Sequence, residues 1–501
     1  MIDVIIPLAG KGTRFFALSE YNKSLLPYKN KEILYHLISN LERQNKEFRF
    51  IFVVNYQKEK ITEFLKNYFK DNNSNNQYVV VEQKELNGPL GAIYSCLDVI
   101  TSDKLLIHLG DMILDDKLEF DKDFLGVQEV PDFSRWCMVD KDSNFYDKPS
   151  VKPNTNLALN GLYFFTDAPA FKEATKETIE KDTPLINNEY QFSQMLEKYA
   201  RKTKFDLRKI KIIDVGNIDD FLKLTNFKKS RFFNNLGLQQ NLFTKISKDQ
   251  KILKEFYHLK LIKDLNLLDI PELYNINYSS KGIEFNMANI KGESLDFIYI
   301  FKNETLEFYE NLFDSLLKKL KQIILAYQLD GDNNDLDFIL YERGIEELKG
   351  YLKYVTKNSV ICHGDYHLGN MILSEGKIHF VDPSGRFTSV KYYDLAKLIH
   401  SVIYDYSLVK FNLYKINGEK IYFYNSHLED KKQLFLSLLE KYFNKEELKE
   451  AKILNMIIFK TMQSLHEEDE HKQIFEAIHK KLKKEIDSGD YKLNLFTEIE
   501  K

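Results

Sequence analysis

The chain of 501 residues is longer than one hydrophobic core usually organises, so we expect two or three domains. Hydrophobic residues make up 44% and charged residues 29%, with 20 Gly and 10 Pro, a balance that excludes a long disordered or collagen-like region. The net charge of −4 gives no whole-chain positive field for nucleic acid or an anionic membrane. We expect small-molecule partners, with no nucleic acid and no membrane insertion, and leave oligomerisation open.

The cysteines point to a reducing compartment. Cys96, Cys137 and Cys362 are odd in number and far apart, and they form no CxxC pair. The first residues, MIDVIIPLAG, carry no basic leader, and no apolar run reaches membrane-spanning length. The sequence therefore predicts a cytoplasmic protein.

Residues 1–225 alternate short apolar runs with helical patterns. Strands are predicted at Ile2 to Pro7, Phe48 to Asn55, Tyr78 to Glu82 and Leu105 to Leu109, and helices at Ile33 to Leu41 and Lys58 to Tyr68. This rhythm predicts an α/β domain, Rossmann-like, with a mostly parallel sheet and crossover helices. Residues 128–168 lose the alternation and predict an insertion of strands and loops that covers the substrate.

The segment DVGNIDDFLKLTNF predicts a strand end, a turn and a closing helix, so we place the domain boundary near residue 228. In the second domain, 229–501, residues 235–295 mix β-type and helical patterns. From about residue 300 the pattern is mostly helical, with a block of loops and strands at 359–390. A small mixed lobe and a larger helical lobe are expected.

A glycine turn after the first predicted strand suits phosphate binding. In PLAGKGTRF, Ala9, Gly10 and Gly12 let the backbone approach a ligand, so that successive amides can converge on phosphate oxygens. Arg14 and Lys23 are cations suited to the same phosphates. A glycine turn after a strand is often only a tight connection. The phosphate-binding interpretation therefore depends on motifs further along the chain.

Two carboxylates follow apolar runs in this domain. Asp111 comes after LLIHLG and Asp214 lies in IIDVGN, at the strand ends where open α/β sheets form ligand sites. Asp beside Gly is also common turn chemistry. Together, the two carboxylates predict a Mg²⁺ held against a nucleoside triphosphate while a phosphate oxygen attacks the α-phosphorus.

These pieces resemble the sugar-phosphate nucleotidylyltransferase family over residues 1–227. PLAGKGTRF, NKSLLP, EQ with GPLGA, LGDMIL, DKPSVKPNTNLALNGLYFF and IIDVGNIDDFL occur in that family's order. The resemblance implies that Arg14 and Lys23 grip the phosphates, that Gln83 and Gly88 face the base, and that Asp111 and Asp214 take the metal. It further implies that Lys148 binds the sugar phosphate. Asp147 and the backbone around Gly161 could supply hydrogen-bonding partners for a sugar. A pyrimidine NTP is favoured, with the base left open. NKS stands where the family usually has PKP, and Asp147-Lys148 where it has Glu-Lys.

The sharpest motif lies in VICHGDYHLGNMILSEGKIHFVDPSGRF. Asn370 comes five residues after Asp365, and Asp382 twelve residues after Asn370, the arrangement of a catalytic loop and a metal loop in phosphoryl transfer from ATP. Asp365 would accept or orient the proton of a substrate hydroxyl. Asn370 and Asp382 would hold Mg²⁺ on the phosphates. The non-catalytic alternative is that this segment is an ordinary polar hairpin between two strands.

The motif HGDYHLGN resembles that of the aminoglycoside phosphotransferase and choline kinase family, and the resemblance covers residues 235–480. The resemblance implies a two-lobed, protein-kinase-like phosphotransferase that acts on small molecules. In its small lobe Lys245 would contact the ATP phosphates and Glu255 would pair with Lys245. Asp394 matches a family position that we interpret as structural, and NNLGLQQ is a poorly marked cover loop.

The sequence therefore predicts a bifunctional enzyme. The kinase would phosphorylate a sugar or polyol, and the nucleotidyltransferase would couple that phosphate to an NTP, giving an activated building block for a surface polysaccharide. The alternative substrate is choline or another amino alcohol, for which Trp136, Glu189 and Tyr190 could surround a trimethylammonium group. A third hypothesis makes one domain a catalytically dead binding or regulatory module.

Overall fold

The computed structural model describes residues 1–501 except 12–17, 19–20, 73, 182, 187, 217, 225–241, 248, 280–281, 330–339 and 342–343. The chain divides into two compact units, with the main division between Phe221 and Leu222. This division falls inside the helix Ile218–Leu224, which is described below with the first unit. The boundary expected near residue 228 lies outside the described residues. None of the described helices combines the length and the apolar character that crossing a membrane requires.

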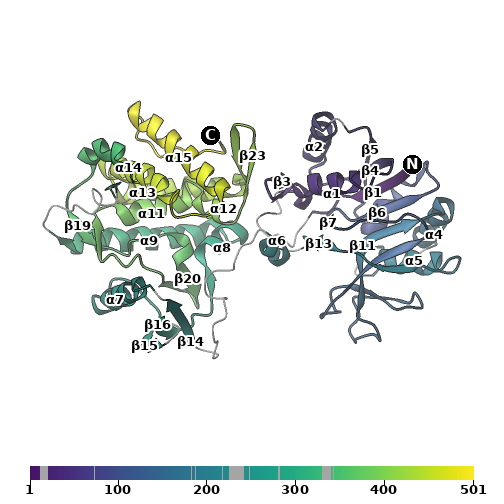
Figure 1. The fold of residues 1–501 in the computed structure, drawn as a ribbon, viewed down its shortest axis with the longest axis horizontal. Coiled ribbons are helices and arrows are strands. Elements are labelled where there is room, and N and C mark those ends of the chain that lie inside the picture. Colours follow the sequence, from purple (N-terminus) through teal and green to yellow (C-terminus); the bar gives the residue numbers. More distant parts are fainter. Residues whose placement is uncertain are drawn as a thin grey trace. The chain divides into compact units, whose positions relative to one another are not determined.

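The first unit is an α/β domain whose elements alternate along the chain (Figure 1). Its main sheet comprises β1 (Ile2–Pro7), β4 (Phe48–Val54), β5 (Gln77–Glu82), β6 (Leu105–His108), β8 (Phe124–Glu129), β9 (Cys137–Val139), β10 (Phe145–Asp147), β11 (Leu157–Phe165) and β12 (Asp206–Lys209). Its helices are α1 (Ile33–Glu42), α2 (Lys58–Asp71), α3 (Pro89–Tyr94), α4 (Ala168–Glu180), α5 (Phe192–Tyr199) and α6 (Ile218–Leu224), with short turns η2 (Lys23–Leu25) and η3 (Leu97–Val99). Two small pairs lie apart from the main sheet: β2 (Pro27–Tyr28) with β3 (Lys31–Glu32), and β7 (Met112–Leu114) with β13 (Ile212–Asp214).

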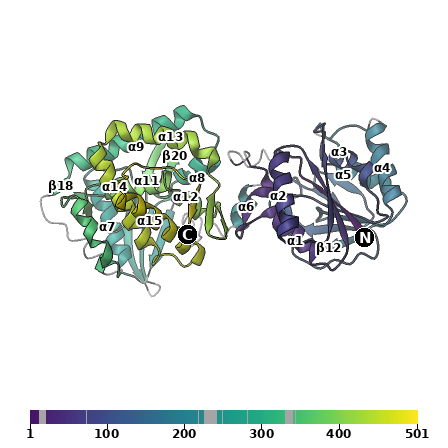
Figure 2. The ribbon, with the colours of Figure 1, turned by 90° about the horizontal axis from the view of Figure 1, so that it is seen from above.

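The centre of this sheet is parallel. β1 pairs in parallel with β4 on one side and β6 on the other, and β4 pairs in parallel with β5. Side chains along β1 alternate between two cores: Val4 and Ile6 pack toward α1 and α2, and Ile5 packs toward α3, α4 and α5. Figure 2 shows α1 and α2 on one side of the sheet and α3, α4 and α5 on the other. The predicted mostly parallel, Rossmann-like sheet is confirmed, and each predicted strand and helix ends within a few residues of the observed one.

One expectation for this unit is wrong. Residues 128–168 were expected to form an insertion, but β11 belongs to the main sheet, where it pairs antiparallel with β6 and β8. Its side chains from Ala158 to Phe165 are buried on both faces. The alternation of strand and helix fails there because the strand turns back antiparallel and so needs no crossover helix.

The second unit begins with a small mixed part. Strands β14 (Leu242–Ser247), β16 (Gly282–Ala288) and β15 (Leu273–Ser279) form an antiparallel sheet in that order, and α7 (Lys251–Asp264) packs on it. Phe243, Ile252, Leu259 and Phe285 belong to its core. Figure 1 shows these elements gathered at one end of the unit.

The remainder of the second unit is mostly helical. Its helices are α8 (Leu295–Phe301), α9 (Leu306–Ala326), α11 (Tyr393–Val402), α12 (Tyr406–Lys410), α13 (Glu429–Tyr442), α14 (Lys445–Met462) and α15 (Asp469–Asp487), with turns η4 (Glu346–Tyr354), η5 (Leu368–Asn370) and η6 (Ser426–Leu428). Short strands form three small sheets: β17 (Glu293–Ser294), β20 (Met371–Ser374) and β21 (Lys377–Phe380); β18 (Gln328–Leu329), β19 (Ser359–Ile361) and β22 (Thr388–Val390); and β23 (Tyr414–Asn417), β24 (Lys420–Phe423) and β25 (Glu498–Glu500). The sheet of β23, β24 and β25 was not expected from the sequence.

A buried ion pair holds the start of the central strand. Asp3 is fully buried and accepts hydrogen bonds from Arg49 Nη1 at 3.0 Å and from the backbone N–H groups of Thr101 at 2.7 Å and Ser102 at 3.0 Å. One carboxylate thus ties β1 to β4 and to the loop before β6.

Asp3→Ala leaves these donors without their acceptor, so we expect it to destabilise the first unit by on the order of 3 kcal/mol. Amide hydrogen exchange should then speed up by about two orders of magnitude in β1 and β4. Peptides from α13 and α14, in the other unit, serve as the internal reference. The exposed Asp103→Ala is the matched control, and equal exchange in the two variants would contradict this role of Asp3.

Candidate functional site

Two adjoining cavities in the first unit lie where β1 and β6 end. One, of about 420 Å³, is lined by residues that include Ala9, Gly10, Lys23, Gln83, Gly88 and Glu189. The other, of about 220 Å³, is lined by residues that include Trp136, Asp147, Lys148, Gly161, Gln191 and Asp214. Asp111 lines both, so the two cavities meet at this carboxylate.

Lys23 forms an ion pair with Asp111 at this meeting point. Partial burial raises the pKa of Asp111, but the Lys23 ammonium more than offsets that effect, and the pKa lies below its usual value. The adjacent Asn22 is buried and fixes the turn, because its Nδ2 donates to Leu8 O at 3.0 Å and its Oδ1 accepts from Ser24 N at 3.1 Å. Asn22, which stands in place of the usual Pro, therefore anchors Lys23 to the end of β1.

Asp214 lies beside Asp111 through the pairing of β13 with β7. Val215 N donates to Asp111 O at 2.9 Å, and Gly216 N donates to Asp214 Oδ1 at 2.7 Å. A Cβ atom at Gly216 would lie 3.0 Å from Asp214 Oδ1 and 3.6 Å from Asp111 Oδ2, so both carboxylates face the space that this glycine leaves open. Burial and the nearby Asp111 carboxylate raise the pKa of Asp214.

This pair of carboxylates fits a divalent cation. Two carboxylates that face one space repel each other, and a hard cation such as Mg²⁺, which takes oxygen ligands, relieves that repulsion. Asp111 and Asp214 are the residues that could hold it, with Lys23 free to turn toward a phosphate once the cation neutralises Asp111.

The 220 Å³ cavity offers several polar groups. Ser193 Oγ donates to Asp147 Oδ2 at 2.9 Å, which orients that carboxylate. Lys148 has a positive φ of 43° and donates its backbone N–H to Trp136 O at 2.9 Å. Gly161 has a φ of 84°, a backbone conformation that residues with a Cβ rarely adopt, so this position in the cavity lining favours glycine.

The other site residues predicted for this unit differ in whether they line a cavity or pack against the core. Gln83 is buried, and its side-chain Nε2 donates to Glu85 O at 2.8 Å and to Asn87 Oδ1 at 3.2 Å. These hydrogen bonds shape the loop that leads to Gly88. The Tyr190 ring packs against the core of the unit, whereas Trp136 and Glu189 line the cavities. Gly12 and Arg14 lie outside the described residues.

In the second unit, Asp365 follows β19 and is held from both sides. Lys397 Nζ lies 2.8 Å from Asp365 Oδ1, and Asn370 Nδ2 donates to Asp365 Oδ2 at 2.8 Å. Burial by itself raises the pKa of Asp365, but Lys397 and then His367 outweigh it and hold the pKa well below its usual range. The carboxylate is therefore ionised at neutral pH and can accept a hydrogen bond from a hydroxyl group.

Lys245 connects the small mixed part to this loop region. Its ammonium pairs with Glu255 on α7 and lies 3.1 Å from Asp382 Oδ1. Asn370 Nδ2 lies 3.4 Å from Asp382 O. The structure thus brings together the five residues to which the sequence analysis gave a part in phosphoryl transfer: Asp365, Asn370, Asp382, Lys245 and Glu255.

A buried carboxylate on α11 shapes the turn before Asp365. The two oxygens of Asp394 accept the backbone N–H groups of His363 at 2.7 Å and Gly364 at 2.8 Å, and burial raises the pKa of Asp394 to about 7. Gly364 has a φ of 75°, and a Cβ there would lie 2.0 Å from Ser384 Oγ. Asp394 acts on the loop backbone, as a structural role requires.

Sequence reasoning missed several residues of both sites. Asn22 was noted only as a departure from a pattern, and Ser193 and Gln191 carried no motif. Lys397 lies three residues after Asp394 on one helix, a spacing that places both side chains on the same face and that could have revealed it.

Comparisons with known proteins concern the first half of the chain. Residues 3–231 match the family model described as nucleotidyl transferase. This chain is similar to a UDP-glucose pyrophosphorylase complexed with UDP-glucose, at 20% identity over 45% of this chain and 98% of that one, with a TM-score of 0.40. It is also similar to HddC from Yersinia pseudotuberculosis, at 23% identity over 46% of this chain and 100% of that one, with a TM-score of 0.35. A third similar structure is a nucleoside-diphosphate-sugar pyrophosphorylase from Vibrio cholerae, at 16% identity over 44% of this chain and 98% of that one, with a TM-score of 0.39.

A search of curated proteins finds no match to the chain. The family match shows that the first unit is a nucleotidyl transferase domain, which confirms that part of the expectation.

The single tryptophan provides a local test of cation binding, because Trp136 lines the same cavity as Asp111 and Asp214. We expect Mn²⁺, a paramagnetic substitute for Mg²⁺, to quench Trp136 fluorescence in the wild type. Asp111→Asn and Asp214→Asn should each abolish the quenching, because each removes a ligand charge. Asp382→Asn, which alters the other unit, is the control and should leave it unchanged. Undiminished quenching in both first-unit variants would place the cation elsewhere.

Proposed function

We propose that the protein is a bifunctional enzyme that makes an activated building block of the kind used in surface polysaccharides. The second unit phosphorylates a hydroxyl group of a sugar or polyol with ATP. The nucleotidyl transferase domain then couples that phosphate to an NTP, with a pyrimidine nucleotide favoured, and releases pyrophosphate.

In the first step Asp365 orients the substrate hydroxyl and takes its proton. The hydroxyl oxygen bonds to the γ-phosphorus of ATP, the bond from that phosphorus to the β,γ-bridging oxygen breaks, and ADP leaves. Asn370 and Asp382 would hold Mg²⁺, which neutralises charge on the phosphates. Lys245, fixed by Glu255, lies 3.1 Å from Asp382 and can reach the same phosphates. The ionised Asp365, held between Lys397 and Asn370, is the observation that carries this step.

In the second step an oxygen of the new phosphate monoester attacks the α-phosphorus of the NTP, and pyrophosphate leaves. Asp111 and Asp214 would hold Mg²⁺, which offsets the charge that develops on the phosphates. Lys23 and the backbone at Ala9 and Gly10 face the cavity that would receive the triphosphate. Lys148 lines the adjoining cavity and would bind the phosphate of the second substrate.

The lining of the 220 Å³ cavity favours a sugar or polyol over choline. Asp147, Gln191 and Ser193 supply hydrogen-bonding groups, and a site built from such groups rejects a ligand that leaves them unpaired. The proposed cage for a trimethylammonium group needs Tyr190, whose ring packs against the core.

The two activities should be separable. Asp365→Asn should lower the rate of ATP-dependent phosphorylation by about 10²- to 10⁴-fold, because it removes the proton acceptor, while nucleotidyl transfer to a pre-phosphorylated substrate stays at the wild-type rate. Asp111→Asn should do the reverse, so each variant is the control for the other. ADP release and pyrophosphate release are measured separately. A second unit that releases no ADP with any substrate would instead be a binding or regulatory module.

The substrate class is tested by a two-stage screen. Sugars, polyols and choline are offered with ATP and Mg²⁺, the products are offered with each NTP, and pyrophosphate is measured. We expect a sugar or polyol to give the highest kcat/KM in both stages, and Lys148→Met to raise the KM for its phosphate. Higher efficiency with choline, and then with phosphocholine and CTP, would overturn the sugar assignment.

A further inference from the structure

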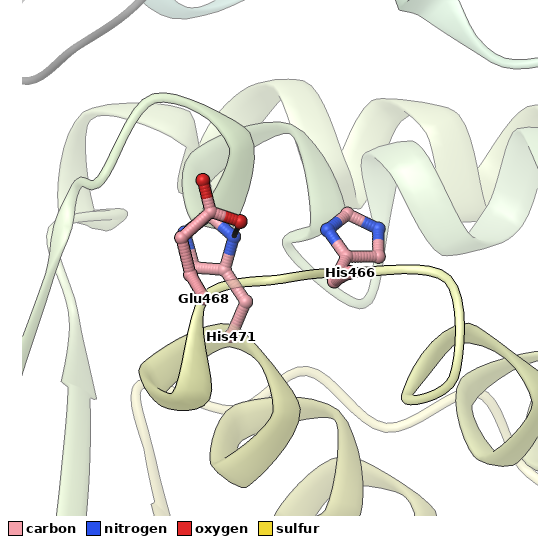
Figure 3. Close-up of side chains that lie close together, drawn as sticks. All are labelled: His466, Glu468 and His471. Atoms are coloured by element: carbon pink, nitrogen blue, oxygen red, sulfur yellow. Dashed lines mark ion pairs between the residues drawn. The ribbon is translucent and has the colours of Figure 1, made fainter.

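A third cluster of titratable side chains lies outside both sites. His466 belongs to the loop between α14 and α15, and Glu468 and His471 lie at the start of α15 (Figure 3). One ligand atom from each, an imidazole nitrogen from each histidine and an oxygen of the glutamate, lies within 4.8 Å of the other two. The steps proposed above use none of these residues.

The hydrogen bond of His471 leaves one nitrogen open to a ligand. His471 is only 7% exposed, and its Nε2 lies 2.8 Å from Asn412 Oδ1. An amide oxygen only accepts, so Nε2 carries the proton and Nδ1 carries the lone pair. Nδ1 is buried and has no hydrogen-bond partner among the described residues.

Two electron-rich atoms therefore face each other. His471 Nδ1 lies 3.5 Å from Glu468 Oε2. A lone pair and a carboxylate oxygen at this separation leave a place for a cation between them.

His466 completes the set. Its ring packs edge-on against Phe475, with centroids 4.8 Å apart. Figure 3 shows a ring nitrogen of His466 facing the other two side chains.

We propose that His466, Glu468 and His471 bind a divalent transition metal, with Zn²⁺ as the first candidate. Two imidazoles and one carboxylate suit Zn²⁺, whereas Mg²⁺ and Ca²⁺ prefer oxygen ligands alone. Tetrahedral Zn²⁺ at about 2.0–2.1 Å from each donor spaces the donors about 3.4 Å apart. The pair of Nδ1 and Oε2 already has that spacing, and the Glu468 side chain, 66% exposed, is free to adjust. The fourth position is left to water.

Asn412 is the positioning residue of this site. Its oxygen fixes the His471 tautomer, as hydrogen-bonded partners of metal ligands usually do. Bound metal would join the loop after α14 to the first turn of α15. This proposal does not depend on the proposed function, because it invokes neither nucleotide nor phosphate.

The test uses the full chain without a histidine tag, freed of metal with a chelator and kept in Mg²⁺ to occupy oxygen-ligand sites. Zn²⁺ binding is measured by competition with a chromophoric chelator, and Co²⁺ is added separately so that its visible absorption reports nitrogen ligands. We expect one tight Zn²⁺ per chain, a Co²⁺ spectrum typical of imidazole ligation, and a higher melting temperature with Zn²⁺.

The variants isolate the site. His466→Gln, His471→Gln and Glu468→Gln should each remove the tight Zn²⁺ and the Co²⁺ bands. Asn412→Gly, which tolerates the φ of 56° at this position, should weaken Zn²⁺ binding by about 10- to 100-fold. Glu467→Gln, the adjacent exposed glutamate, is the matched control and should bind like the wild type.

Two results would overturn the proposal. One is tight Zn²⁺ binding that persists unchanged in both His466→Gln and Glu468→Gln, since the exposed Glu468 can be replaced without disturbing the fold. The other is a wild-type chain that binds no Zn²⁺ and shows no visible Co²⁺ absorption.

Discussion

Both sites depend on an ion pair between a lysine and a partly buried carboxylate. The lysine ammonium keeps the carboxylate ionised although it is shielded from bulk water. Lys23 does this for Asp111, and Lys397 does it for Asp365. Without these partners, burial would raise the pKa of each carboxylate and favour its neutral form, which neither accepts a hydroxyl proton nor attracts a cation. At the first of these sites, Asn22 also fixes the turn that carries Lys23.

The same constraint makes each site responsive to a ligand. Asp111 pairs with Lys23, yet the Asp111 carboxylate still raises the pKa of Asp214, so one positive charge does not balance two carboxylates. A divalent cation held by Asp111 and Asp214 would restore that balance and would leave Lys23 available to a phosphate. In the second unit Lys245 already lies between two carboxylates, Glu255 and Asp382, and a cation on Asp382 would leave Lys245 to Glu255 and the nucleotide.

The fold supplies these charges at the ends of strands. β1 and β6 are buried on both faces and end at the cavities, and β19 ends just before the loop that carries Asp365. Because a strand's side chains alternate between two cores, the strand cannot shift its register without exposing apolar residues. The fixed strand in turn fixes the start of the loop that follows it. Each unit has its own core, which is the physical basis for expecting separable activities.

The sequence by itself determined the parallel strands and their helices, because their signals are local: continuous apolar runs for β1, β4 and β6 and helical spacing for α1 and α2. It also determined the grouping of Asp365 with Asn370, since one short loop carries both. Only the tertiary structure decided that β11 is a central strand, because its antiparallel partners lie elsewhere in the chain. It likewise decided which groups face Asp111. Contacts between residues far apart in sequence, such as Lys23 with Asp111, depend on how the strands assemble, and no local pattern encodes that assembly.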